Sequence, residues 1–365
     1  MTDESGRSHR ASGAELGDYH AFGAPVVAPV AGRVWRCEGT IPDNPPGGSD
    51  TRPGRNFGNH VLLRTPDGVF VLLGHLRQHS LAVGAGDWVE AGTPIGACGN
   101  SGRSTQPHVH LQAQMLEDPG APTRPSHLRG VVVRDCAGER GDFRLAARPR
   151  QGALVTQAAP QPALAGALHM PAGRTFALRD EDGVDHGFAV ELTLLGQFRL
   201  TTATGASAAF EERADVLAFY DRRGGKDAAL DAWLLALGVC PFAGVASRWR
   251  DAPPADLAPL APFQRLALAL LRPFGASLDS RYERTWDEAT ATWRQTGHHA
   301  LTLLPGVTLT VDTEAEIDPV AGCVAITLSR GTHRRRYMLA DTGRRGDVGV
   351  AALVVPLAPP RARAA

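Results

Sequence analysis

Between residues 20 and 115 the sequence consists of short apolar runs that alternate with turns rich in glycine, proline and asparagine. Runs of this length are typical of strands and are too short for independent helices. They are Val26–Val30, Val61–Arg64, Val69–Leu73, Trp88–Ile95 and His108–Gln114. Turn residues at such short spacing connect antiparallel neighbours, so we predict a mainly β N-terminal domain with an antiparallel, barrel-sandwich-like sheet.

Beyond residue 165 helical and strand periods both occur, which predicts an α+β C-terminal domain. The predicted strands are Arg174–Ala177, Phe188–Leu200, Ala300–Val311, Val324–Leu328 and Arg336–Leu339, and the predicted helices are Asp227–Leu237, Phe263–Leu271 and Tyr282–Arg294. Proline and glycine gather between residues 117 and 165. We therefore expect a domain at residues 1–136, a linker at 137–165 and a domain of unknown role at 166–365.

Charge and hydropathy exclude several classes of function. Lys+Arg 38 balance Asp+Glu 38, so no global field attracts nucleic acid, and the basic run Arg334–Arg336 is interpreted as a solvated strand edge. No run of 18 apolar residues occurs, so we predict no membrane span. The five cysteines form no C-x-x-C pair, which argues against a zinc ribbon or a dense disulfide framework.

Three histidines mark the candidate site. His108 and His110 are two positions apart in a predicted strand, so both imidazoles lie on one face, and His75 ends another apolar run. Such imidazoles can bind a metal or transfer protons, although an isolated H-x-H is more often a pair of strand histidines. Glycine turns at Val83–Gly96 and Gly99–Ser104 converge on these histidines, which favours a site.

Taken together, these segments resemble the lysostaphin-type (LytM-like) zinc metallopeptidases, which cut peptidoglycan cross-bridges. The resemblance covers about residues 15–115, in the order and spacing of that family. The segments that carry it are Phe22–Val34, Gly58–Val61, Gly74–Leu76, Val83–Gly96, Gly99–Ser104 and Pro107–Leu111.

The resemblance implies a role for each matching residue. His110 would be a ligand of Zn²⁺, and His75 and His108 would flank the metal-bound water as proton-transfer and transition-state-stabilising groups. Asn100 and Ser101 would shape the groove for a glycine-rich peptide. The implied activity is zinc-dependent hydrolysis of peptidoglycan cross-link peptides, and the partner of the C-terminal domain is not indicated.

One family element is missing. The other two zinc ligands of the family are spaced H-x-x-x-D before the G-x-P-V strand, but Gly13 lies four residues after His9, and Ala14 lies four residues before Asp18. A single imidazole does not hold catalytic zinc, so we expect zinc to be weakly bound or absent and activity to be weak or lacking.

Three explanations of the missing pair remain open. The ligand strand can precede Met1, in which case we expect the cell envelope or secretion; with Met1 as the true start, the polar N-terminus predicts a cytoplasmic protein. The chain can be a non-catalytic relative that binds cell wall or regulates a partner. Finally, His9 and Asp18, with His20, can serve as substitute ligands.

Two rival classes fit less well. The turn Val83–Gly96 also resembles half of a biotinyl or lipoyl carrier, but carriers need a lysine at a hairpin tip, and the one lysine, Lys226, lies in the other domain. The acidic run Asp180–Gly183 lacks the glycine that a calcium loop requires at its sixth position, which is Asp185. We therefore interpret that run as a turn.

Overall fold

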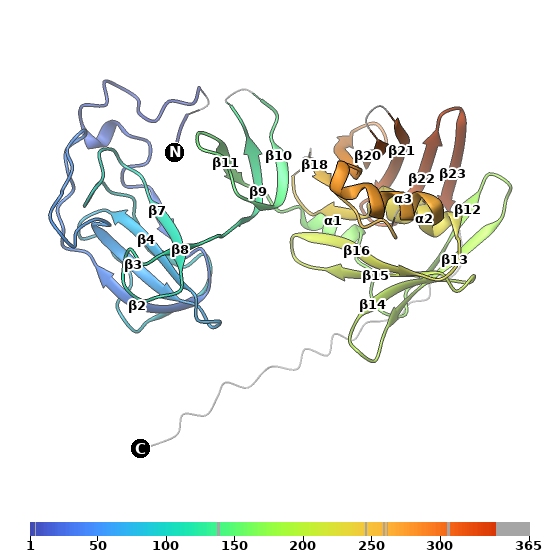
Figure 1. Ribbon diagram of the computed structural model, residues 1–365, viewed down its shortest axis with the longest axis horizontal. Helices are drawn as coiled ribbons and strands as arrows, with labels where there is room; N and C mark the ends of the chain where they lie inside the picture. Colours follow the sequence, from blue (N-terminus) through green and yellow to red (C-terminus); the bar gives the residue numbers. More distant parts are fainter. Residues whose placement is uncertain are drawn as a thin grey trace, which may run out of the picture. The chain divides into compact units, whose positions relative to one another are not determined.

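The computed structural model describes residues 1–340 except residues 4, 137–138, 245–246, 258–259, 261 and 305–306. It contains two compact units (Figure 1). The N-terminal unit comprises Met1–Pro160 and Ser247–Arg250, and the C-terminal unit comprises Gln161–Ala246 and Asp251–Ala365. Among the described residues, no helix combines the length and the apolar character needed to cross a membrane.

Two antiparallel sheets build residues 25–124 of the N-terminal unit. The six-stranded sheet has the order β5 (Trp88–Val89), β2 (Gly32–Glu38), β3 (Asn59–Arg64), β4 (Phe70–Leu76), β7 (His110–Gln114) and β8 (Thr123–Arg124). The two-stranded sheet pairs β1 (Pro25–Val27) with β6 (Pro94–Ala97), and the short 3₁₀ helix η1 (Leu16–Asp18) precedes it. The mainly β, antiparallel prediction is confirmed.

The strand next to the site is buried on both faces. Val71 and Leu73 of β4 belong to the larger core cluster, whereas Phe70 and Leu72 pack in a second cluster with Leu62. A strand covered on both sides is apolar at successive positions rather than at alternate ones, which explains the Phe-Val-Leu-Leu run. This rigid strand carries His75 at its end.

The segment predicted as a linker contains regular structure. Strand β9 (Leu128–Arg134) pairs antiparallel with β10 (Asp142–Ala147) and with β11 (Leu154–Gln157). On its other edge, β10 pairs in parallel with β18 (Ser247–Asp251) through Phe143 and Trp249. Of the prolines that suggested a linker, Pro149 lies in the connection between β10 and β11, Pro160 follows β11, and Pro162 begins the helix α1 (Pro162–Ala167).

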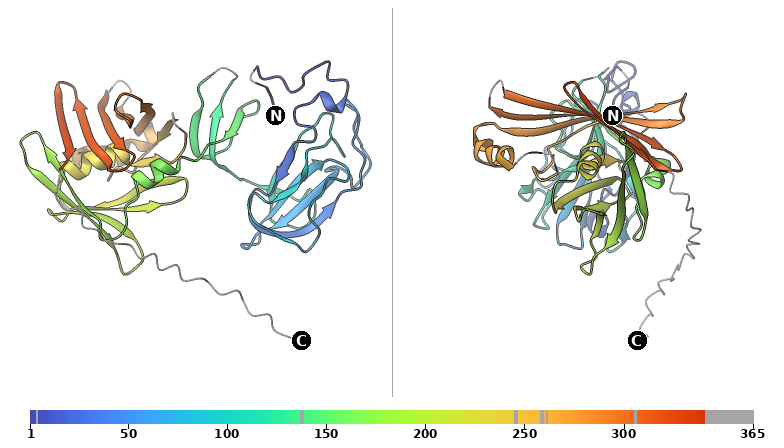
Figure 2. Two further views of the ribbon diagram at one scale, coloured as in Figure 1. Left: turned by 180° about the vertical axis from the view of Figure 1, so that it is seen from behind. Right: turned by 90° about the vertical axis from the view of Figure 1, so that its right-hand side faces the viewer.

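The C-terminal unit is a long antiparallel sheet that encloses a helix (Figures 1 and 2). Its strands, in spatial order, are β19 (Ser277–Asp287), β20 (Thr292–Leu304), β21 (Val307–Asp318), β22 (Gly322–Arg330), β23 (His333–Leu339), β12 (Thr175–Asp180), β13 (Asp185–Leu192), β14 (Phe198–Thr202), β15 (Ser207–Glu212), β16 (Val216–Arg223) and β17 (Val239–Pro241). The helices are α1 (Pro162–Ala167), α2 (Ala228–Leu237), α3 (Pro262–Leu271) and the 3₁₀ helix η2 (Arg272–Phe274).

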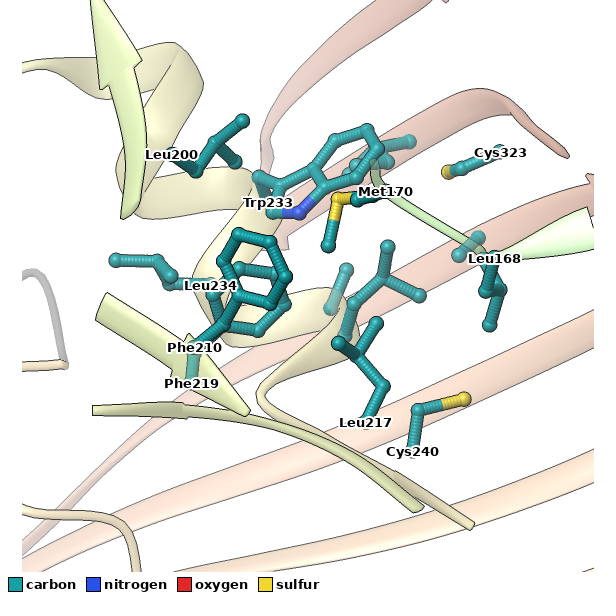
Figure 3. Close-up of a cluster of buried hydrophobic side chains, with 14 of the residues drawn as sticks. Leu168, Met170, Leu200, Phe210, Leu217, Phe219, Trp233, Leu234, Cys240 and Cys323 are labelled. Carbon is teal, nitrogen blue, oxygen red and sulfur yellow. The ribbon is translucent and has the colours of Figure 1, made fainter. Parts of the chain in front are cut away.

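Helix α2 occupies the centre of this unit (Figure 3). Asp227 caps its N-terminus by accepting a hydrogen bond from the Leu230 N–H, and every residue from Ala229 to Leu237 is buried. Trp233 and Leu234 of the helix pack in one cluster with Phe210 and other strand residues. The helix therefore buries both sides against the sheet, and its prediction at Asp227–Leu237 is confirmed.

One predicted helix is wrong. Residues Tyr282–Arg294 form the β19–β20 hairpin instead, with Trp286 opposite Trp293 and their ring centroids 5.0 Å apart. Residues seven positions apart share a helix face, but they also face each other across a hairpin with a turn between them. The strand predicted at Ala300–Val311 is two strands, with residues 305–306 outside the described part of the chain.

Candidate functional site

Strand pairing brings the three histidines together. Strand β7 lies beside β4 with Gly74 opposite His110, so His75, at the next position, lies near both residues of the H-x-H. The ring centroid of His75 is 4.7 Å from that of His108 and 6.0 Å from that of His110. The sequence prediction that these imidazoles converge agrees with this geometry.

The backbone at His75 is unusual because two glycine loops meet behind it. His75 has φ 59°, in the left-handed region that non-glycine residues rarely adopt. A Cβ at Gly58 would lie 2.4 Å from the Ser101 carbonyl carbon, and one at Gly102 would lie 2.2 Å from the Gly58 nitrogen. Only glycine at both positions allows the two loops to approach this closely.

Hydrogen bonding leaves one nitrogen of His75 available. Its Nδ1 lies 2.8 Å from the Ser101 carbonyl oxygen, which accepts and therefore requires a proton on Nδ1. The described residues provide no hydrogen-bond partner for Nε2, whose lone pair is then free to accept. Burial lowers the pKa of His75 to about 4; the bond to Ser101 opposes this effect, and His108 and His110 add to it. The imidazole is therefore neutral at pH 7.

His108 is oriented in the same way but is exposed. Its Nδ1 lies 2.8 Å from the Gln106 carbonyl oxygen and 3.2 Å from the Ser104 hydroxyl. A carbonyl at this distance again places the proton on Nδ1 and leaves the Nε2 lone pair available. The site thus combines a buried and an exposed imidazole, each with a free Nε2.

His110 is oriented by a chain of glutamine side chains along the same face of β7. The Gln114 amide nitrogen donates to the carbonyl oxygens of Leu116 and Asp118, which leaves its Oε1 to accept from Gln112. Gln112 Oε1 lies 2.7 Å from His110 Nε2 and accepts from it. Two backbone carbonyls thereby assign the proton of His110 to Nε2 and leave Nδ1 as the free nitrogen.

Asn100 and Ser101, the predicted groove residues, are both fully buried. The Asn100 amide donates to the Asn44 carbonyl and its Oδ1 accepts from Ser104, while the Ser101 hydroxyl donates to the Leu76 carbonyl. The Asn59 N–H in turn donates to Ser101. These side chains fix the backbone of the loop that carries the Ser101 carbonyl. They would therefore shape a groove by positioning that backbone, since the side chains themselves are buried.

The three substitute ligands lie in one short segment of their own. His9 pairs with Tyr19 in an isolated β-bridge, and its Nδ1 contacts the Ala11 carbonyl at 3.1 Å. The Asp18 carboxylate accepts from the Glu15 N–H at 3.3 Å. His20 Nε2 is buried, and no described residue forms a hydrogen bond with it. The His9 and Asp18 side chains thus have local partners, and their role as ligands stays a prediction.

The described residues can be compared with the donor set of a catalytic zinc site, for which weak or absent zinc stays a prediction. Such a site has three protein ligands and an open position. Within the described residues, no group of three or more His, Cys, Asp or Glu side chains is placed to share a metal ion. The free Nδ1 of His110 suits a zinc ligand, and its bond to Gln112 is the kind of outer support that metal-binding histidines have. One prepared imidazole is too few to retain the metal.

Several residues of the site were not identified from the sequence. Gln112 and Gln114 follow the two histidines at the same two-residue period, H-x-H-x-Q-x-Q, so a signal for them was present. Asn59 and Ser104 act through contacts between segments far apart in the chain, as their bonds to Ile41 and Asn100 show. No spacing rule finds such contacts.

Comparison with known proteins identifies the class of this fold and site. Residues 17–122 match the family model described as peptidase family M23. The N-terminal unit therefore contains a LytM-like domain of the M23 peptidases, and the resemblance found in the sequence is confirmed.

Parts of this chain are similar to particular proteins and solved structures. A 66-residue stretch, 18% of this chain, is 41% identical to the DD-carboxypeptidase/endopeptidase Mpg of Neisseria meningitidis serogroup B and of Neisseria gonorrhoeae, and it spans 15% of each relative. Solved structures include a mutant catalytic domain of the prophage-encoded M23 protein EnpA from Enterococcus faecalis (26% identity, TM-score 0.22, 29% of this chain and 75% of that one). The catalytic domain of the antimicrobial peptidase lysostaphin from Staphylococcus simulans is also similar (28% identity, TM-score 0.21, 30% of this chain and 78% of that one).

Proposed function

We propose that the N-terminal unit binds the cross-link peptides of peptidoglycan at the three-histidine site and hydrolyses them weakly or not at all. The observation that carries this proposal is the cluster of His75, His108 and His110. Among the described residues, each of these imidazoles has one nitrogen without a hydrogen-bond partner, and no group of three or more His, Cys, Asp or Glu side chains is placed to share a metal ion. The substrate class comes from the resemblance to the lysostaphin-type metallopeptidases, and the similar Neisseria proteins are named as a DD-carboxypeptidase/endopeptidase.

The geometry supports a division of work between the imidazoles. Neutral His75 and His108 present Nε2 lone pairs, which can accept hydrogen bonds from peptide N–H groups or protons from water. His110 would be the zinc ligand through Nδ1, and zinc, when bound, would supply a polarised water. Because His110 is the one prepared zinc ligand, we expect the domain to retain peptide binding more readily than peptide hydrolysis.

The test measures binding, hydrolysis and metal on the same protein. Purified peptidoglycan sacculi are incubated with the full chain; co-sedimentation reports binding, chromatography reports released muropeptides, and elemental analysis reports zinc per chain. We expect co-sedimentation, little release and zinc well below one per chain. His75→Ala and His108→Ala should weaken co-sedimentation, whereas the matched control His127→Ala, an exposed histidine elsewhere, should not.

Two results would change the conclusion. Absence of co-sedimentation together with absence of release overturns the proposal. One zinc per chain together with substantial muropeptide release overturns the proposal of weak or absent hydrolysis. If His9→Ala and Asp18→Asn then lose both the zinc and the release, those residues are the substitute ligands. His110→Ala should abolish any residual zinc in either case.

A further inference from the structure

The C-terminal unit contains a cavity of about 650 Å³. This volume lies in the ordinary range of small-molecule sites, which is about 300–1,000 Å³. Its walls come from α2, from Leu260, from Gln264 of α3, and from the inner face of strands β19–β23. No residue of the M23-like domain contributes, so the cavity is separate from the histidine site.

One wall is a single face of helix α2. Ala228, Asp231, Ala232 and Leu235 line the cavity, and their spacing of three and four residues places them in one stripe. The carboxylate in this stripe is already neutralised, because Asp231 pairs with Arg222 at 2.8 Å. The helix therefore offers a ligand mainly small and aliphatic side chains.

The opposite wall is a ladder of strand residues. Leu278 lies opposite Leu301, and Leu301 lies opposite Leu309, across β19, β20 and β21. The neighbouring polar residue on this face, His299, lies between Ser280 at 2.8 Å and Thr313 at 2.9 Å. Both of its nitrogens are occupied, so it leaves no free hydrogen-bonding group for a ligand. Apart from Gln264 of α3, which also lines the cavity, the interior offers a ligand mainly apolar side chains.

The opening has a different character. Its exposed residues are basic: Lys226, Arg330, His333, Arg334 and Arg335, which we call the basic rim. The β22–β23 hairpin concentrates four of them by pairing Arg330 with His333 and Ser329 with Arg334. In the part of the chain that the structure describes, Lys226, Arg330 and Arg334 have no ion-pair partner, although thirteen other arginines do. Uncompensated positive charge at the mouth of an apolar cavity selects for a negative group there.

We propose that the C-terminal unit binds a single-chain anionic amphiphile, with its aliphatic tail between α2 and the leucine ladder and its carboxylate or phosphate head at the basic rim. Burial of the tail supplies most of the affinity, because binding free energy grows with the apolar area removed from water. Arginine forks at the rim supply the selectivity for an oxyanion. The proposal assigns a ligand class to the unit for which the sequence indicates no role.

The experiment titrates the full chain with matched probes by isothermal calorimetry below their critical micelle concentrations. The probes are dodecanoate, dodecyl phosphate, dodecanol and inorganic phosphate. We expect both anionic amphiphiles to bind at least about tenfold more tightly than dodecanol, since charge-assisted hydrogen bonds contribute that much. Inorganic phosphate alone should not bind measurably. The ratio of dodecanoate to dodecyl phosphate affinity identifies the preferred head.

Variants separate the head from the tail. Arg330→Ala combined with Arg334→Ala should weaken dodecanoate binding about tenfold and leave dodecanol binding unchanged. The matched control Arg281→Ala, on an exposed position of β19, should change neither. Leu309→Trp, at a cavity residue that is 36% exposed, should weaken both probes by filling the space, whereas Leu194→Trp in an exposed turn should not.

Hydrogen exchange of the unmodified chain, with and without dodecanoate, locates the binding site without any variant. Protection should appear in α2 and in the β22–β23 hairpin. Equal affinity for dodecanoate and dodecanol overturns the role of the basic rim. Binding that survives Leu309→Trp in the folded variant, protection located elsewhere, or no binding of either anionic amphiphile overturns the proposal as a whole.

Discussion

Each unit of this chain buries a histidine whose pKa is lowered to about 4, mainly by burial. In the N-terminal unit, His75 forms one hydrogen bond, to the Ser101 carbonyl, and its Nε2 is free and faces other imidazoles. In the C-terminal unit, His299 lies between Ser280 and Thr313 and uses both nitrogens. Their burial and titration are therefore alike, but the chemistry available to them is not.

The backbone repeats this contrast. His299 occupies a regular position in β20, paired with residues of β19 and β21. His75 has a left-handed φ of 59° and depends on two loops that meet through glycine. The comparison teaches that a lowered pKa alone does not mark a functional histidine. A free nitrogen held by an unusual backbone is the more selective sign.

The largest expected effect comes from the glycine contact behind His75. Gly102→Ala introduces a Cβ 2.2 Å from the Gly58 nitrogen at a φ of 75°, so the loops must separate. We expect a loss of about 4 kcal/mol in the unfolding free energy of the N-terminal unit, near the upper end for single substitutions. Hydrogen exchange of the β3 and β4 amides measures it.

The control for that change is Gly54→Ala. Gly54 also has a positive φ of 79°, but a Cβ there would meet nothing within 4 Å. Only the backbone strain remains, which costs about 1 kcal/mol. Equal losses in the two variants would show that the loop contact does not support the site.

Removing the structural histidine should cost nearly as much as removing the loop contact. His299→Leu leaves the hydroxyls of Ser280 and Thr313 buried without their partner, so we expect the C-terminal unit to lose about 3 kcal/mol. His298→Ala, at the exposed neighbour that pairs with Asp312, should change stability by less than about 0.5 kcal/mol. Urea unfolding of both variants gives the comparison. If His299→Leu leaves the unfolding free energy unchanged, the two hydrogen bonds of His299 do not stabilise the unit.

Acid should destabilise both units over the same pH range. The folded-state pKa of each buried histidine, about 4, lies below the ordinary value of 6.5, so the unfolded chain binds more protons between these values. The stability that each neutral imidazole contributes is complete above about pH 7. It is lost as pH falls from 6.5 to about 4, by about 3 kcal/mol per histidine.

Urea midpoints at several pH values test this dependence. His75→Asn should remove it from the N-terminal unit only, because asparagine tolerates the left-handed backbone and does not titrate. His299→Leu should remove it from the C-terminal unit only. If His75→Asn leaves the pH profile of the N-terminal unit unchanged, other groups govern its acid sensitivity.

The smallest expected effect concerns the free nitrogen itself. Gln112→Ala removes the acceptor that holds the proton of His110 on Nε2, so the two neutral tautomers should become mixed. Nitrogen chemical shifts of His110 measure their ratio, and stability should change by less than about 1 kcal/mol. Gln112→Glu keeps an acceptor and should restore the Nε2–H tautomer. An unchanged ratio in Gln112→Ala would show that the glutamine chain does not orient this imidazole.

Much of the histidine site could be predicted from the sequence, and little of the cavity could. Strand alternation places His108 and His110 on one face, and the glycine loops indicate where the chain turns toward them. Which nitrogen of each ring is free depends on carbonyls such as that of Ser101, which no pattern of side chains reveals. The cavity needs the β19–β20 hairpin, where the spacing of Trp286 and Trp293 suggested a helix. The spacing of apolar residues within this segment cannot distinguish a helix from a hairpin, because the hairpin is stabilised by pairing with β21.

The enclosed helix α2 also constrains how the C-terminal unit is made. Within its sheet β23 pairs with β12, which places Leu339 beside Leu178, although the two residues are far apart in the unit's sequence. During synthesis α2 emerges long before β23, so a helix that is apolar on all sides must wait for its last cover. Contacts this distant in sequence slow folding and prolong the exposure of apolar surface. The unit is therefore expected to fold late and to depend on chaperones more than the M23-like domain does.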